Sequence, residues 1–476
     1  MTELPKGWEW ATVDELAVDA GITDGPFGSN LKTAHYTSSG PRVVRLQNIG
    51  DGRFNDEQAH ISSEHYAQLM KHSVAPADVL VASLGAVLPR ACLAPSTLGP
   101  AIVKADCIRV RPSNLVAGSY LMHALNSPGT RERVTESIKG VGRPRVNLGD
   151  LRALMLPIAP RIEQQRIVGA IEEAFSKLDA GEAGLRTVRR LLKRLRDAVL
   201  AAAVTGRLVP QDPTDPPAIK LLAGLGVEAL DSPALGRLPE SWAWASMGDV
   251  TVIGSGIQKQ PKRAPTRNPT PFLRVANVGR GTLDLDDVHL IEVFEGELDR
   301  YGLERGDLLV VEGNGSPDQI GRSAMWHGSI DPCVHQNHLI RVRPSEVLLP
   351  EFLEFYWNSP DASGRVQAVA SSTSGLHTLS TGKLKGLPVA IPPPEEQARI
   401  VAEVDRQVSF LNACEQAIGG GLACAAALRR SVLKAAFEGK LAPQDPSDEP
   451  ASVSLERIRA ELAATPKAAR QSRRTA

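Results

Sequence analysis

Few stretches of the chain have residue types and spacings that could do chemistry, and none completes a known catalytic pattern. Gly375 to Lys383 has the outline of a phosphate-binding loop, in which backbone N–H groups, a lysine and a hydroxyl hold a nucleotide and its magnesium ion. However, the first glycine lies two positions too far away, and Leu384 replaces the serine or threonine that would bind magnesium. Asp215 to Ala218 resembles the Asp-Pro-Pro-Tyr sequence of adenine methyltransferases, but Ala218 cannot stack on a flipped base. The sequence therefore predicts neither a nucleotide-binding loop nor a methyltransferase centre.

Cys333, His335 and His338 have a spacing at which a metal could be bound. The matching stretch of the first half of the chain lacks both histidines, so we expect no metal, and a metal site here is the alternative. The five cysteines form no Cys-x-x-Cys pair, which predicts reduced thiols rather than disulfides or structural zinc.

The remaining candidates are groups that could recognise DNA. Gln47, Asn48 and Asn277 follow strand-like runs, and their amides could pair with N6 and N7 of adenine; ordinary turn residues are the alternative. Lysines and arginines cluster in predicted loops, where they could contact a phosphate backbone or simply form solvated surface. The residues predicted to bind DNA are Ser29, Asn30, Lys32, Gln47, Asn48, Arg90, Lys139, Arg143 and Arg145 in the first half of the chain, and Lys259, Lys262, Arg263, Asn277, Asn314 and Arg322 in the second.

The overall charge limits what kind of DNA binding is possible. The chain has 54 lysines and arginines and 54 aspartates and glutamates, so its net charge is zero. This balance argues against a protein that binds polyanions regardless of their sequence, and any DNA contact must depend on local basic patches. The chain has no signal peptide and no apolar run of about 18 residues, which predicts a cytosolic protein without membrane contact.

Two long segments organise the rest of the chain. Between Arg161 and Val204, apolar residues recur at alternating spacings of four and three, which predicts a long helix with one seam that faces a partner helix. Adding 233 to each number finds a second and poorer seam, which the three glycines at 419–421 should weaken or bend. The predicted seam residues are Ile167, Ile171, Leu178, Leu185, Val188, Leu192, Leu195 and Val199 in the first rod, and Ile400, Val404, Leu411, Ile418, Leu428 and Val432 in the second.

The repeat extends to both sides of the rods. Upstream, Arg45 to Gly50 matches Arg274 to Gly279. Downstream, Thr205 to Asp215 is copied by Glu438 to Asp448. A mere tether need not be copied, so we expect each copy to dock on a neighbouring globule and close the chain into a pseudo-two-fold ring; a relic of duplication is the alternative.

Outside the rods, the patterns predict two α+β globules. Val79 to Ala82 and Leu308 to Val311 have the apolar character of buried strands, and Tyr120 to Leu125 and Phe352 to Trp357 that of short helices. The predicted boundaries are a first globule at 1–160, a first rod at 161–206, a linker at 207–237, a second globule at 238–393, a second rod at 394–439, and a linker-like segment with a basic tail at 440–476.

With the repeat and the rods, nearly the whole chain resembles the specificity subunit of a type I restriction–modification system. The similar stretches are Asp24 to Lys32, Arg45 to Ile49, Leu156 to Val168 and Leu387 to Val401. The resemblance implies two target recognition domains, each reading one half of a split site in double-stranded DNA, and two helices that pack as an antiparallel coiled coil between them. It also implies a chain that is not an enzyme and binds no cofactor. Two methyltransferase subunits and restriction subunits would bind to it, and these partners would use S-adenosylmethionine, ATP and magnesium.

Two other classes of protein are the alternatives. A single-chain DNA methyltransferase would need an aromatic catalytic motif and a cofactor-binding glycine loop, and the sequence has neither. A structural coiled-coil rod would have no need of two large, unlike globules.

Overall fold

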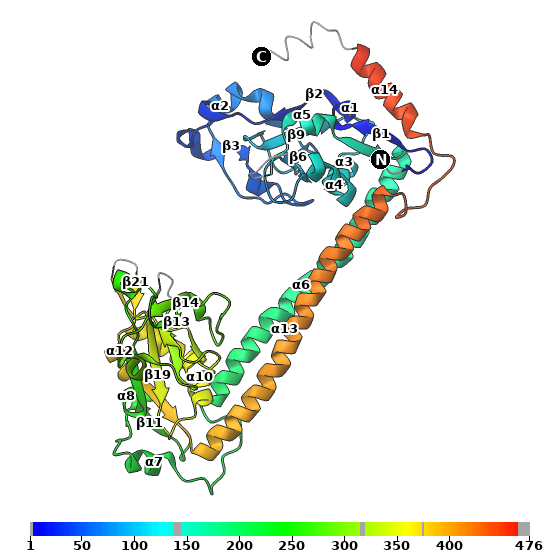
Figure 1. The fold of residues 1–476 in the computed structure, drawn as a ribbon. Coiled ribbons are helices and arrows are strands. Elements are labelled where there is room, and N and C mark those ends of the chain that lie inside the picture. Colours follow the sequence, from blue (N-terminus) through cyan, green and yellow to red (C-terminus); the bar gives the residue numbers. More distant parts are fainter. Residues whose placement is uncertain (1–2, 138–143, 315–318, 374–375, 465–476) are drawn as a thin grey trace. The chain divides into compact units, whose positions relative to one another are not determined.

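The computed structural model describes residues 3–137, 144–314, 319–373 and 376–464 (Figure 1). The described residues form two compact units. Unit 1 consists of those within 1–185 and 420–476, and unit 2 of those within 186–419. Each unit contains one globule and one end of each of two long helices, α6 (Arg161–Ala203) and α13 (Pro394–Phe437). The chain is therefore a mixed α+β protein, as predicted.

The globule of unit 1 contains two four-stranded sheets. The first has the order β2-β9-β6-β7, is antiparallel throughout, and consists of β2 (Ala17–Asp24), β9 (Cys107–Pro112), β6 (Val79–Ala82) and β7 (Arg90–Leu93). The second has the order β4-β3-β8-β5 and consists of β4 (His60–Ile61), β3 (Tyr36–Val44), β8 (Ala101–Val103) and β5 (Ser73–Val74). A separate pair, β1 (Glu9–Thr12) and β10 (Met155–Ile158), joins the beginning and the end of the globule. Its helices are α1 (Val13–Leu16), α2 (Ser63–Gln68), α3 (Gly118–Asn126), α4 (Pro128–Ser137) and α5 (Leu148–Ala153).

The globule of unit 2 has a corresponding antiparallel sheet with the order β12-β19-β15-β17. Its strands are β12 (Thr251–Ser255), β19 (Leu339–Pro344), β15 (Leu308–Val311) and β17 (Ser323–Met325). The smaller sheets consist of β14 (His289–Glu292), β13 (Pro269–Leu273) and β18 (Val334–His335), of β16 (Gly313–Asn314), β21 (Leu376–Thr378) and β20 (Ser371–Thr373), and of β11 (Ala243–Ser246) with β22 (Pro388–Ile391). The helices are α8 (Met247–Val250), α9 (Glu297–Tyr301), α10 (Pro350–Asn358), α11 (Pro360–Val369) and α12 (Thr381–Lys385).

In each globule a fully buried strand lies at the centre of the main sheet. All four residues of β6 and of β15 are buried, and each strand is paired on both sides. Tyr120 of α3 is buried, and its hydroxyl donates to the carbonyl oxygen of Pro157 at 2.9 Å, which ties α3 to β10. The predicted strands and short helices of both globules are confirmed at these positions.

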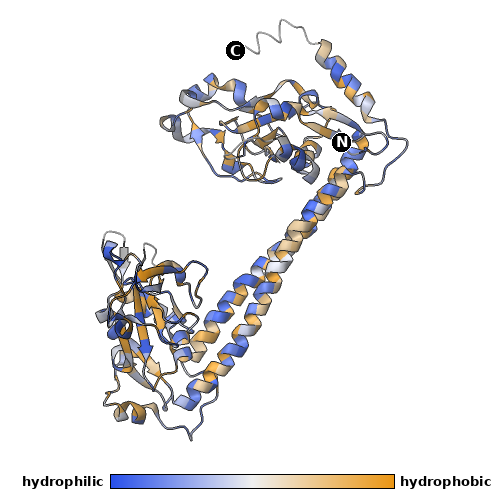
Figure 2. Cartoon of the chain, viewed as in Figure 1, coloured by the Kyte–Doolittle hydropathy of each residue, from blue (hydrophilic) through white to orange (hydrophobic). Residues whose placement is uncertain are grey.

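The ends of α6 and α13 run antiparallel within each unit. In unit 1, Arg429 is bonded to Asp179 and Glu182, and Gly421 lies against Leu185, so the numbers fall along α13 as they rise along α6. In unit 2, Arg196 donates to Asn412 at 2.6 Å, while Val199 shares a core with Ile400 and Val404. Around both helices, hydrophilic and hydrophobic residues are interspersed (Figure 2). The three glycines do not interrupt α13, which is helical throughout its 44 residues.

The predicted seam is only partly buried. Ile167, Ile171, Val199, Ile400, Val404, Leu411 and Ile418 are buried, and Leu178, Leu185, Leu192 and Val432 are half-buried. The prediction is wrong for Val188, Leu195 and Leu428, which are 45%, 50% and 47% exposed. A straight helix turns about 20° per heptad relative to a strict seven-residue repeat, so one row of apolar residues stays against the partner while the other turns towards solvent.

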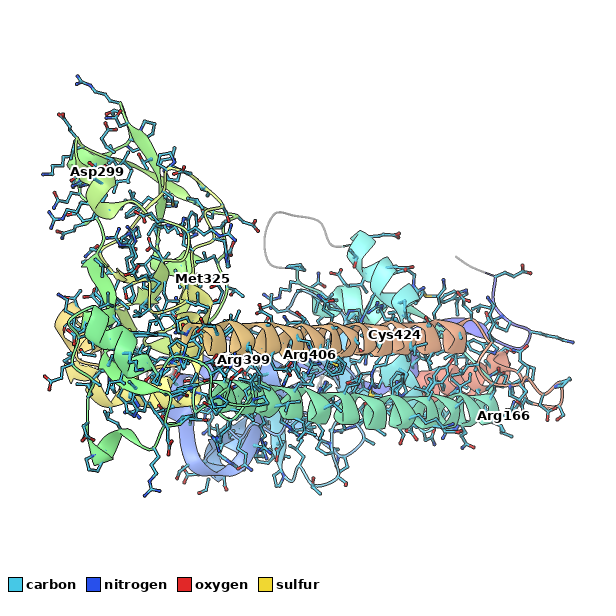
Figure 3. All side chains as sticks on the ribbon, turned by 90° about the horizontal axis from the view of Figure 1, so that it is seen from below. Arg166, Asp299, Met325, Arg399, Arg406 and Cys424 are labelled. Atoms are coloured by element: carbon cyan, nitrogen blue, oxygen red, sulfur yellow. The ribbon has the colours of Figure 1, made fainter. Side chains whose placement is uncertain are left out.

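The segment after each long helix packs on a globule of its own unit. In unit 2, Asp215 accepts from Arg399 at 2.6 Å, and the next segment begins the short helix α7 (Ala218–Gly224). In unit 1, Asp448 is bonded in the same way to Arg166, and α14 (Ala451–Ala464) follows. Figure 3 labels these two arginines, which lie near the starts of α6 and α13. The N–H of Ala218 donates to the carbonyl oxygen of Ser241, and that of Ala451 to the carbonyl oxygen of Gly7, both at 2.8 Å. Each copy is therefore docked on the globule of its own unit, as the repeat predicted.

Among the residues that the structure describes, none of the helices combines the length and the apolar character that a membrane span requires.

Candidate nucleic-acid interface

The loop at residues 24–32 in the first globule is braced by its backbone. Gly25 permits a close approach, because a Cβ atom there would lie 2.0 Å from the carbonyl carbon of Lys104. Further along, the carbonyl oxygen of Asn30 lies 2.9 Å from Nε2 of His65 in α2. These contacts position the loop without using its exposed polar side chains, which remain available to a ligand.

The two asparagines expected to read bases are structural instead. Asn48 is 1% exposed; its Oδ1 accepts from the backbone of Arg45 at 2.8 Å, and its Nδ2 donates to two carbonyl oxygens at 2.8 Å. Asn277 is also buried and makes the corresponding bonds to the backbone of Arg274, Asp284 and Asp287. Neither amide is available to adenine, so the prediction that these two residues bind DNA is wrong and the turn interpretation is correct.

Arg90 and Arg322 hold the same turns in place. Nη2 of Arg90 donates to the carbonyl oxygen of Leu46 at 3.2 Å. Arg322 donates to the carbonyl oxygens of Val278 and Val275 at 2.8 and 3.0 Å. Both guanidinium groups are partly buried and committed to the backbone, so we interpret them as residues that position the turns rather than as primary DNA contacts.

The basic loop of the second globule is organised by two carboxylates. Glu292 accepts from the backbone N–H groups of Thr266, Arg267 and Asn268 at 2.7, 3.0 and 2.9 Å. These bonds stabilise the ionised carboxylate and lower its pKa. A carboxylate that receives three backbone donors fixes the course of the loop.

The second of these carboxylates, Glu297, pairs with Arg263 through two bonds of 2.7 and 2.8 Å. The hydrogen bonds from Arg263 lower the pKa of Glu297 to about 2. The guanidinium carbon of Arg263 also lies 4.8 Å from the centre of the Phe294 ring. Arg263 therefore braces the loop, and a groove of about 480 Å³ lies between the loop and strands β13 and β14.

The other predicted DNA-binding residues differ in their exposure to solvent. The exposed ones are Asn30, Lys32, Gln47, Lys259 and Lys262. Lys139 and Arg143 lie outside the described residues, as do the side chains of Ser29 and Asn314. Arg145 is half-exposed and forms an ion pair with Asp106 at 2.6 Å. A role in DNA binding stays a prediction for all of these residues.

The alternative of a metal site receives no support from the part of the chain that the structure describes. No group of three or more histidines, cysteines, aspartates or glutamates comes together there as a metal site. His335 is buried, which lowers its pKa to about 3, whereas Nδ1 of His338 lies 3.0 Å from Glu312.

Comparison with known proteins gives a consistent result over the whole chain. No family model matches the sequence. The chain is 26% identical over 490 residues to the Type I restriction enzyme EcoKI specificity subunit of Escherichia coli K12, with 97% of each chain covered. It is 25% identical over 485 residues to the Type I restriction enzyme StySPI specificity subunit of Salmonella potsdam, covering 97% of this chain and 96% of that one. The chain is therefore similar, over nearly its whole length, to type I restriction specificity subunits.

The fold is also similar to that of a solved protein chain. A chain solved in work on complex assembly and conformational transition of the type I restriction–modification system superposes with a TM-score of 0.63. The two are 19% identical, and the match covers 92% of this chain and all of the other.

Some residues of this interface were not found from the sequence. Glu292 lies 24 positions from Asn268 and Glu297 lies 34 positions from Arg263. No local sequence pattern indicates that these carboxylates hold the loop. The sequence did contain a signal for Phe27, because it is an aromatic residue next to a glycine in one of the stretches that resemble the family.

Proposed function

We propose that this chain is the DNA-binding specificity subunit of a type I restriction–modification complex and recognises a bipartite site in double-stranded DNA. The observation that carries the proposal is the similarity to specificity subunits along 97% of the chain. The structure supports it by placing in each unit one globule with an exposed polar loop braced from behind. Flexible cations such as Lys32 and Lys259 can contact phosphates, while amides such as Gln47 can reach base edges.

We further propose that the two globules are separate target recognition domains with the boundaries predicted from the sequence, 1–160 and 238–393. On this proposal α6 and α13 form one continuous antiparallel coiled coil that sets the spacer between the half-sites. The docked segments at 207–237 and 440–464 would then close the repeat into a pseudo-two-fold ring. The antiparallel contacts found separately in each unit support this arrangement.

The partners that we propose are two methyltransferase subunits and restriction subunits. An exposed apolar row on α6, formed by Val188, Leu191 and Leu195, lies among exposed cations and is suited to an acidic and apolar partner surface. Those cations are Arg189, Arg190, Lys193 and Arg194. Burial of this row against a partner would remove apolar surface from water. A partner would therefore account for the exposure of Val188 and Leu195, which were predicted as seam residues, in the chain alone.

Catalysis on this proposal belongs to the partners. The chain would bind no cofactor itself, whereas the partner subunits would use S-adenosylmethionine, ATP and magnesium. Because its ligand is cellular DNA, we propose that the protein acts in the cytoplasm.

The test is a reconstitution with purified components. The full chain is co-purified with methyltransferase subunits from its own system, and methyl transfer from S-adenosylmethionine to a random DNA library is sequenced. We expect the complex to methylate one split sequence and the chain alone to transfer no methyl groups. Transfer by the chain alone would support the single-chain methyltransferase, and a complex without sequence preference would support a structural rod.

A further inference from the structure

Phe27 presents an aromatic ring at the surface of the loop at 24–32. Phe27 is 47% exposed, although phenylalanine is one of the largest apolar residues. The next residue, Gly28, has a φ of +61°, and a Cβ atom added there would meet nothing within 4 Å. The ring therefore lies beside open space, on a loop whose backbone is fixed through Gly25.

One side of the ring is supported by a guanidinium group. The guanidinium carbon of Arg145 lies 5.7 Å from the ring centre. Nη2 of Arg145 is 2.6 Å from Oδ1 of Asp106, and the backbone of Arg145 pairs with Leu84 in an isolated β-bridge. Since Arg145 is held by both its side chain and its backbone, the ring of Phe27 is pre-organised before any ligand binds.

A hollow of about 320 Å³ adjoins the ring and is lined by both polar and apolar groups. Asp24, Ser83, Asp106 and Asn147 contribute to its wall together with Phe27. Because an aromatic ring and hydrogen-bonding side chains lie together at this hollow, it can distinguish a ligand that offers an apolar group next to hydrogen-bonding groups.

Duplex DNA offers few apolar groups of this kind. In the major groove the 5-methyl group of thymine lies beside the hydrogen-bonding edges of the base pair, and phenylalanine is one of the side chains that contact it. The alternative is a wedge between two base pairs, which must unstack them and needs a ring with free faces. Arg145 covers part of the Phe27 ring, which favours a contact through the ring edge.

We infer that Phe27 is a specificity-determining residue that contacts the 5-methyl group of a thymine in the half-site read by the first globule. This inference rests on the proposed function and names one element of its ligand. Deoxyuridine is the matched probe, because it keeps the base pairing of thymine and lacks only the methyl group.

The experiment measures binding of the complete complex, formed by the full chain and its methyltransferase subunits, to oligonucleotides that contain its methylation site. Each thymine of both half-sites is replaced singly by deoxyuridine. For the unaltered protein we expect one position at which the replacement lowers affinity about fourfold, the ratio that corresponds to burial of about one methyl group. Phe27→Ala should bind the thymine and deoxyuridine oligonucleotides equally at that position, and Phe27→Leu should retain part of the preference.

Met70→Ala is the matched control, because Met70 is 51% exposed in the same globule but lies outside the loop. This variant should keep the full preference for thymine. The inference is overturned if the half-site of the first globule contains no thymine, if no thymine shows the coupling, or if Phe27→Ala alters DNA bending while thymine and deoxyuridine remain equivalent. Failure of the unaltered complex to bind any specific sequence is a separate result, which would refute the proposed function itself.

Discussion

A circularly permuted chain tests whether the two ends of the sequence form one structural unit. The permutant begins at Leu238, and the original ends, Ala476 and Met1, are joined directly. In unit 1, the N–H of Ala451 donates to the carbonyl oxygen of Gly7 at 2.8 Å, so the segment after α13 already packs on the start of the chain. We therefore expect the permutant to fold and to bind the same DNA site.

The expected change in stability is small. The connection that is cut, residues 225–237, has 13 residues, and the new one, 465–476 with 1–3, has 15. Loop-closure entropy changes slowly with length, so this exchange should alter the free energy of unfolding by only about 0.1 kcal/mol. Deletion of residues 440–476 is the contrasting variant. It removes Leu455 and Ile458, which are 1% and 2% exposed in the core of unit 1, and burial of two such side chains contributes about 3 to 6 kcal/mol.

The assay combines thermal unfolding with sequencing of the methylation site in the reconstituted complex. The permutant should match the unaltered chain in both measurements, whereas the deletion variant should unfold at a lower temperature. A soluble, folded permutant that loses the DNA site would refute the reasoning, because it would show that connectivity at 225–237 is required and that the ring does not close. A deletion variant with unchanged stability would show that the docked segment contributes nothing.

Three further predictions concern the long helices. Gly420→Ala should raise the free energy of unfolding by about 1 kcal/mol, because alanine favours the helix more than glycine does. Gly421→Ala should raise it less, because the added Cβ atom would lie 3.0 Å from a leucine methyl group of α6. Equal increases for the two variants in urea unfolding would contradict that contact. Burial raises the pKa of Glu396, so its contribution to stability is full at low pH and is lost as the pH rises through the folded-state pKa. The stability of Glu396→Gln relative to the unaltered chain should therefore be higher at pH 8 than at pH 5. The same difference in melting temperature at both pH values would disprove this. Insertion of one heptad after Leu178 and after Leu411 lengthens each helix by about 10 Å and should weaken binding while lengthening the preferred spacer by about one to three base pairs; an unchanged spacer in a randomised-spacer selection would show that the helices do not set it.

Much of the framework could be predicted from the sequence because its signals are local or periodic. The buried strands β6 and β15 are short apolar runs, and the long helices follow from regular spacing. The repeat also predicted that Asp215 and Asp448 occupy equivalent places, and each is bonded to an arginine near the start of a long helix.

The candidate site was predicted less well, because the same residue type serves two purposes. An asparagine after a strand is suited either to a base edge or to a turn, and only the three bonds of Asn48 to the backbone decide between them. Arg263 looked like a DNA contact, but the sequence does not indicate that Glu297, which lies 34 positions away, holds it. The apolar spacing of α6 likewise does not reveal which row turns outwards, and this is why Val188 and Leu195 were misplaced.

The most direct test of the central claim is an exchange of one globule. Residues 238–393 are replaced by the corresponding segment of another specificity subunit, the chimera is combined with methyltransferase subunits, and the methylated sites are sequenced genome-wide. If each globule reads its own half of the site, one half-site changes to that of the donor while the other half and the spacer length stay the same. A chimera in which both half-sites change, or in which neither changes, would contradict recognition of one half-site by each globule.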